Sequence, residues 1–196
     1  MLSDDERDLV RRLAGKLRLH QEKKLQQLDL YYDGEQRLQH LGLAVPPELR
    51  MFETVVNVPA MAVDEPTGRQ ELRAFYRAGS EQPDPALREG WAFNNMQSLS
   101  GLTHKDRALY GFTYVAVASN PESDEYPLIT AESPLNVVTQ QQRGRIASAL
   151  KLWREDDDRT QYGSLYTPGR SVPLVYGKRG WEQHPDIEPD EHGLGR

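Results

Sequence analysis

The first thirty residues carry apolar side chains at helical spacing. Ser3 and Glu6 form the S-x-x-E pattern that caps a helix N-terminus. Apolar positions then recur at three-, four- and eight-residue steps and leave a face of Arg, Lys, Gln and Asp. These positions are Leu9, Leu13, Leu17, Leu25, Leu28 and Tyr32. The pattern predicts one long amphipathic helix that runs to about Asp29 and is closed by residues 31–34.

Two shorter segments with helical features follow. Pro46-Pro47 suits the first turn of a helix, which the sequence interrupts at residues 57–59. A short helical piece is expected to continue to Asp64 and to stop at residues 65–68, which contain Pro66 and a glycine. Residues 72–76 are expected to form a short strand.

A third helix is predicted from Asp84-Pro85, where an N-cap residue precedes proline at the first helical position, to Gly111. Its larger side chains are expected to face the core, against residues 112–117. They are Trp91, Leu99, Leu102, Leu109 and Tyr110.

The pattern changes to alternating apolar and polar residues after residue 112. Short runs of this kind, separated by turn residues, predict an antiparallel meander. The predicted strands are 112–118, 128–132, 136–140, 145–153, 160–166 and 172–176. Because helices come first and strands later, the sequence predicts an α+β fold.

This order suggests a domain over residues 1–180, helical over 1–111 and strand-rich over 112–180. Residues 181–196 contain five acidic residues and one arginine, which concentrates much of the net charge of −6. We therefore expect this last segment to be an acidic, extended tail that leads out of the core.

Composition excludes several classes of function. The chain has no cysteine, which excludes disulfides, thiol catalysis and Cys-based zinc sites. It has no apolar run of membrane-spanning length, and its first residues are acidic and lack the basic and apolar regions typical of a signal peptide. The acidic balance argues against tight wrapping of nucleic acid, which needs clustered Lys and Arg.

The clearest candidates for catalysis or metal binding are acidic residues and one histidine. Asp156, Asp157 and Asp158 could bind a divalent cation, but a solvated hairpin turn explains them better. His104 and Asp106 are two residues apart on a predicted helix and so do not share a face. We therefore expect no catalytic, cofactor-binding or metal-binding residue, and no cofactor.

Basic and aromatic residues offer a second possibility, a nucleic-acid surface. The first helix carries Arg11, Arg12, Lys16, Arg18, Lys23 and Lys24. Acidic residues interleave with them, since residues 1–50 hold nine of each sign, and a solvated amphipathic helix is favoured. Trp91, Trp153 and Trp181 are better explained as core or interface anchors than as base-stacking platforms.

Several segments occur in an order that is typical of one family. A first block consists of Tyr31-Tyr32-Asp33-Gly34-Glu35-Gln36-Arg37-Leu38, Val55-Val56-Asn57-Val58-Pro59 and Val63-Asp64. Trp91-Ala-Phe-Asn-Asn95 and the run from His104-Lys-Asp-Arg-Ala-Leu-Tyr-Gly111 to Val117 form a second. Glu132-Ser133-Pro134 and Leu165-Tyr166-Thr-Pro168 follow. These blocks resemble the portal proteins of long-tailed phages, particularly phages of actinobacterial hosts.

The resemblance implies a structural, non-enzymatic protein. Portal proteins form a ring, usually a dodecamer, at one capsid vertex of the virion, and DNA passes through its channel without tight binding. Their other partners are terminase, scaffold or capsid proteins and head-completion proteins, and they assemble in the bacterial cytoplasm without a membrane. The resemblance covers the N-terminal wing region, so we expect this chain to be a fragment, or a truncated prophage product, that holds mostly the wing and lacks stem and clip. The alternatives are a metal-dependent nucleic-acid-processing enzyme and another phage head or adaptor protein.

Overall fold

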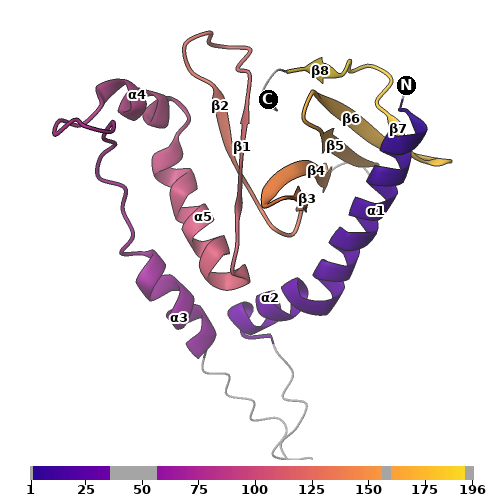
Figure 1. Ribbon diagram of the computed structural model, residues 1–196. Helices are drawn as coiled ribbons and strands as arrows, with labels where there is room; N and C mark the ends of the chain where they lie inside the picture. The colour runs from indigo at the N-terminus through magenta and orange to yellow at the C-terminus, as the bar shows by residue number, and fades with distance from the viewer. Residues whose placement is uncertain (1, 36–56, 156–159, 193–196) are drawn as a thin grey trace, which may run out of the picture. The chain divides into compact units, whose positions relative to one another are not determined.

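The structure is a computed structural model that describes residues 2–35, 57–155 and 160–192. It has the predicted α+β content, with helices in the first half and antiparallel sheets in the second (Figure 1). The chain forms two compact units, residues 1–23 with 133–196 and residues 24–132. None of the helices within the described ranges combines the length and apolarity needed to cross a membrane.

The predicted long N-terminal helix is present, although its pitch changes along its length. It begins as α1, Asp4–His20, continues as a π-helical segment, Gln21–Leu25, and ends as α2, Gln26–Asp33. The predicted capping box is confirmed, because the Ser3 hydroxyl accepts from the Glu6 amide at 3.3 Å and the Glu6 carboxylate accepts from the Ser3 amide at 2.8 Å.

The first unit is an antiparallel meander covered by α1. Its strands follow one another in the order β3-β4-β5-β6-β7, and β8 pairs with β6. Their bounds are Val137–Gln142, Arg145–Arg154, Gln161–Tyr166, Arg170–Gly177, Gly180–Gln183 and Asp190–Glu191. The predicted meander is confirmed from residue 136 onward, whereas the predicted strands 112–118 and 128–132 pair in a separate two-stranded sheet. The first hairpin of the meander turns at Arg143 and Gly144, both with positive φ, as a tight two-residue turn requires.

The core of this unit lies between one face of the sheet and one face of α1 (Figure 1). The helix buries every third or fourth residue, which places Val10, Leu13 and Leu17 against the sheet. Strands β4, β5 and β6 bury alternate residues, as their pleat requires. The sheet residues of the core are Val138, Leu150, Leu152, Leu165, Val172 and Leu174.

The acidic C-terminal segment differs from the extended tail that the sequence suggests. Its first residues form β7, which pairs with β6, and Trp181 packs against the core. Asp190 and Glu191 pair with β6 as β8. The reason is that Trp181 supplies apolar area and the edge of β6 supplies unpaired backbone groups, so local charge does not prevent pairing.

Within its described residues, the second unit combines α2 with three further helices and a two-stranded hairpin. The helices are α3, Val58–Thr67, α4, Pro85–Phe93, and α5, Met96–Tyr110, and the strands are β1, Tyr114–Ala118, and β2, Leu128–Glu132. The predicted strand at 72–76 is wrong: only an isolated bridge joins Tyr76 and Pro83. Pro66 lies inside α3 and does not stop it. The helix predicted to begin at Pro46-Pro47 lies outside the described residues.

The third predicted helix is divided in two at Asn94 and Asn95. Asn94 donates through Nδ2 to the carbonyl of Pro127 at 2.9 Å and accepts through Oδ1 from the amide of Ile129 at 2.7 Å. Asn95 takes φ of 50°, in the left-handed region that asparagine tolerates. A tertiary contact with the start of β2 therefore ends α4 where the sequence predicts continuation.

The face of α5 that turns inward also differs from the prediction. Met96 and Tyr110 are buried and Leu99, Thr103 and Asp106 are half-buried, whereas Leu102 is 57% exposed. These inward residues lie three or four positions apart, so they form one helical stripe that does not include Leu102. The expectation that Leu102 faces the core is wrong, and Trp91 is half-buried.

Candidate functional site

A network of polar side chains joins α2, α3 and α5 within the second unit. The Tyr32 hydroxyl donates to the Asp64 carboxylate, whose two oxygens lie at 2.8 and 3.0 Å. The Lys105 ammonium lies 4.2 Å from the centroid of the Tyr32 ring, within the range of a cation–π contact. Tyr32 of α2 therefore interacts with α3 and α5 together.

Asn57 connects the ends of two helices in this network. Its Nδ2 donates to the carbonyl of Tyr32 at 2.7 Å, one of the last carbonyls of α2. Its Oδ1 accepts from the amide of Ala60 at 3.2 Å, in the first turn of α3. Helix ends leave such backbone groups without partners, so a single amide side chain satisfies both ends.

Two glycines end the helices that carry the network. Gly34 ends α2 with φ of 74° and Gly111 ends α5 with φ of 86°. A left-handed residue after the last turn lets its amide reach back to the helix carbonyls, and glycine adopts it without steric cost. The amide of Gly34 donates to Leu30 and that of Gly111 to Arg107.

The buried side of the network consists of tyrosine and carboxylates. The Tyr110 hydroxyl donates to the Asp29 carboxylate. Burial raises the pKa of Tyr110 above its ordinary value, and the hydrogen bond with Asp29 adds to the rise. Burial also raises the pKa of Asp106; Lys105 opposes that rise and the Asp29 charge adds to it.

Lys105 balances the carboxylates of this cluster. The Tyr32 side chain raises the pKa of Lys105 above its ordinary value; burial opposes the rise, and the charges of Asp64 and Asp106 add to it. Lys105 therefore stays cationic near neutral pH. An ammonium shared among carboxylates and a ring stabilises helix packing.

Asn57→Ala should lower the free energy of unfolding of the second unit by about 1–2 kcal/mol, because it removes a helix cap and a second hydrogen bond. The measurement is thermal unfolding followed by circular dichroism, with hydrogen exchange to locate the loss in α2 and α3. Asn120→Ala is the matched control, since Asn120 accepts only a local bond from the Glu122 amide in an exposed turn. Equal losses in the two variants would contradict a bridging role for Asn57.

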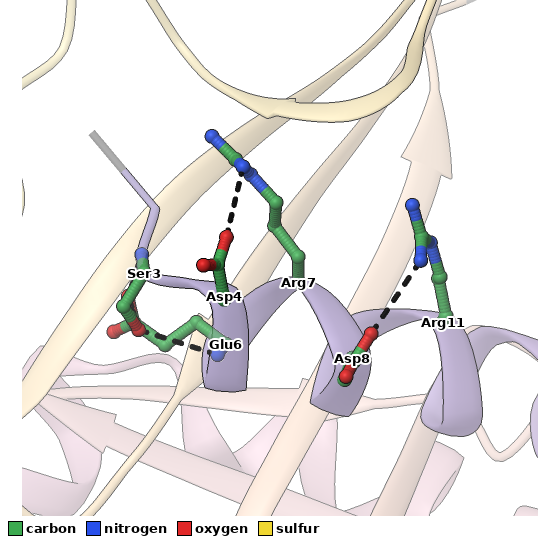
Figure 2. Close-up of polar contacts among 6 residues, drawn as sticks. All are labelled: Ser3, Asp4, Glu6, Arg7, Asp8 and Arg11. Atoms are coloured by element: carbon green, nitrogen blue, oxygen red, sulfur yellow. Dashed lines mark hydrogen bonds and ion pairs between the residues drawn. The ribbon is translucent and has the colours of Figure 1, made fainter.

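The basic residues of the first helix do not form a continuous positive face. Figure 2 shows Arg7 and Arg11 beside each other on α1, each paired with the aspartate three residues earlier, at 3.2 and 3.4 Å. Arg18 pairs with Glu22 at 3.6 Å, and the Lys16 ammonium donates to the Thr139 carbonyl at 2.9 Å. These interactions favour the interpretation of α1 as a solvated amphipathic helix.

His104 and Asp106, the two described candidates for metal-dependent catalysis, lie in different surroundings. His104 lines an apolar groove between α4, α5 and the hairpin, whereas Asp106 lies among Lys105, Asp29 and Tyr110. Asp156–Asp158 lie outside the described residues. Among the residues that are described, no group of three His, Asp or Glu side chains is arranged to hold a metal ion.

The three tryptophans each have an aromatic neighbour. Trp91 meets Phe75 edge-on at 5.3 Å between ring centroids. Trp153 stacks with Tyr162 at 6.3 Å. Trp181 meets Tyr176 at 5.1 Å and packs against the core. Anchoring within the fold, rather than base stacking, accounts for these contacts.

One contact without a sequence signal stabilises the first unit. Arg170 of β6 donates two hydrogen bonds to the Glu6 carboxylate, one of them from Nε at 2.9 Å. The Glu6 side chain is 13% exposed and that of Arg170 is 36% exposed. Burial alone would raise the pKa of Glu6, but hydrogen bonds from Arg170 and Ser3 hold it below its ordinary value. The partners are 164 positions apart in the chain, so no local spacing pattern predicts this contact.

Comparison with known proteins adds a relationship at the level of sequence. The chain is 26% identical over 174 residues to the portal protein of Mycobacterium phage D29, and 24% identical over 174 residues to that of Mycobacterium phage L5. This chain is similar to phage portal proteins. The matches cover 84% of this chain but 35% of each relative, so the chain spans about a third of the length of the portal proteins it matches. No family model matches the chain.

Proposed function

We propose that this chain is a structural component of a phage or prophage portal, the ring at one capsid vertex through which DNA is packaged and ejected. In this role it binds neighbouring subunits and catalyses no reaction. Residues 1–180 are proposed to act together as a wing-like domain in the assembled ring, with both compact units contributing to it. Residues 181–196 are proposed to lead toward a stem and clip region.

The observation that supports this proposal is where the portal-like motifs lie. Tyr32, Asn57 and Asp64 come from the first block of resemblance, and Lys105 and Tyr110 come from the second. All five take part in one connected network around α2, α3 and α5. Motifs far apart in sequence that share one structural role favour a common architecture over chance similarity.

The charge of the chain is consistent with a channel for DNA. A protein through which DNA slides must make few strong phosphate contacts, and a net charge of −6 makes the average long-range force on DNA repulsive. Self-association into a ring, transient contact with DNA, and docking of terminase, capsid or scaffold and head-completion proteins are therefore proposed interactions. The proposed location is the virion vertex, after assembly in the bacterial cytoplasm.

A chimera tests the proposal most directly. If this chain replaces the matching segment of the Mycobacterium phage D29 portal protein, the product should assemble into closed rings, because the helix network that positions the wing is retained. Native mass spectrometry and negative-stain electron microscopy measure ring size and yield. The same chimera with Asn57→Ala and Asp64→Ala should lose most of its rings.

Two results would count against the portal role. One is a chimera that is folded by circular dichroism but stays monomeric. The other is nicking of plasmid DNA by this chain in magnesium that is lost in His104→Ala or Asp157→Ala. The second result would instead support a metal-dependent nucleic-acid-processing enzyme.

A further inference from the structure

A groove with basic and aromatic walls lies beside α1 in the first unit. It has a volume of about 810 Å3 and is lined by α1 and by the hairpin of β6 and β7. Arg7, Arg11 and Arg179 contribute guanidinium groups to it, and Tyr176 and Trp181 contribute rings. All of these residues belong to one compact unit, so the groove is a property of that unit alone.

The groove continues along the helix. A second hollow of about 710 Å3 shares Ala14, Tyr176 and Trp181 with the first and extends it toward Arg18. A side chain added at Gly15 would meet nothing within 4 Å, so this stretch of α1 is open. Small residues in the middle of a groove allow the backbone of a bound segment to approach the helix closely.

The arginines of the groove can exchange their exposed aspartate partners for the carboxylates of a ligand. Figure 2 shows that the side chains of Arg7 and Arg11 extend from the same side of α1. Asp4 is 97% exposed, and Arg11 and Asp8 are 73% and 72% exposed, so their ion pairs contribute little and exchange at low cost. Arg179, in the turn between β6 and β7, is exposed and forms no ion pair with any described residue.

We infer that this groove binds a short acidic peptide segment with an apolar anchor residue, supplied by another protein chain. Arginine forks bind carboxylates through paired hydrogen bonds, and Trp, Tyr and Arg are the residue types that contribute most at protein interfaces. The half-buried Trp181 and Ala14, with the exposed ring of Tyr176, offer apolar area to an anchor side chain. This inference does not depend on the portal role.

Duplex DNA fits the groove less well than an acidic peptide does. Asp4, Asp5 and Asp8 lie exposed on the same helix, and Glu182 lines the groove itself. A phosphate backbone, which spaces charges regularly along its length, would have to pass these carboxylates. A peptide can place its carboxylates at the guanidinium groups and an apolar residue between them.

The test uses a fluorescein-labelled synthetic peptide of sequence Glu-Asp-Leu-Asp-Glu, which places carboxylates on both sides of one apolar residue. Its fluorescence anisotropy is titrated with the whole chain at about 50 mM salt. We expect saturable binding with a dissociation constant of roughly 10–100 μM, typical of a small interface. The double variant Arg11→Ala with Arg179→Ala should weaken binding at least about tenfold, because it removes two charge-assisted contacts.

Two further variants make the result specific. Arg12→Ala is the matched control, because Arg12 is exposed on the same helix but outside the lining, and it should leave the affinity unchanged. Glu182→Gln removes a lining carboxylate and should tighten binding about threefold. General misfolding would weaken binding, so it cannot produce this increase in affinity. The absence of saturable binding, or an equal loss in Arg12→Ala, would overturn the inference. Competition by a 20-base-pair duplex at equal concentration would also overturn it and assign the groove to nucleic acid.

Discussion

Replacing Leu150 with alanine should lower the free energy of unfolding of the unit formed by residues 1–23 and 133–196 by about 3 kcal/mol. Leu150 is 0% exposed and lies in the core between the sheet and α1. The variant loses the transfer free energy of the removed methyl groups and leaves a cavity that a closely packed sheet cannot close. With a urea slope of about 2 kcal/mol/M, the midpoint should fall by about 1.5 M.

The measurement needs a probe that reports on this unit alone. In a Trp91→Phe background, the remaining tryptophans are Trp153 and Trp181, and both belong to the unit in question. Ile146→Ala is the matched control, because Ile146 lies on the same strand but is 60% exposed, and it should cost no more than about 0.5 kcal/mol. Similar midpoint shifts for the two variants would show that the core does not lie where the structure places it.

Glu6→Ala should lower the free energy of unfolding of the same unit by about 2–3 kcal/mol at pH 7, because Glu6 has two structural roles. Its carboxylate completes the capping box with Ser3 and also accepts hydrogen bonds from Arg170. Ser3→Ala should remove only the capping contribution, and Glu6→Gln should keep much of the cap while removing the ion pair. Urea unfolding of the three variants separates the two roles.

The pH dependence of these variants gives an independent measurement. The folded-state pKa of Glu6 lies below its ordinary value of 4.5, so the carboxylate stabilises the fold fully above that pH. The stabilisation is lost as pH falls through the folded-state pKa, when the carboxylate takes up a proton. The difference in stability between the wild type and Glu6→Gln should therefore shrink below about pH 4.5. A difference that stays constant from pH 7 to pH 3 would show that the Arg170 contact does not depend on charge.

The sequence by itself determined the features that depend on neighbours in the chain. The capping box at Ser3 and Glu6 was predictable because its two hydrogen bonds close within three residues. The strands after residue 112 were predictable because alternation is a local property of a half-buried strand, and β2 has the predicted bounds of 128–132. The glycines that end α2 and α5 were predictable for the same reason.

The resemblance to portal proteins was also available from sequence, as an ordered set of short motifs. The contacts that these motifs make in the folded protein could not be predicted from the sequence. The hydrogen bond that Asn57 accepts from the Ala60 amide is a local helix cap. The hydrogen bond that it donates to the Tyr32 carbonyl joins residues 25 positions apart, which no local pattern predicts. Likewise, no local pattern relates Asp29 to Tyr110, which are 81 residues apart.

Only the tertiary structure decided which residues enter the core and where elements end. The third helix divides at Asn94 because its side chain satisfies backbone groups at the start of β2. Because α5 begins at Met96, its inward stripe includes Asp106 and leaves Leu102 exposed. Burial of the Asp106 carboxylate is tolerable because the polar network provides partners for it. Trp181 and β7 belong to the sheet although the segment that follows them is acidic, since pairing with β6 depends on a strand edge that exists only after folding.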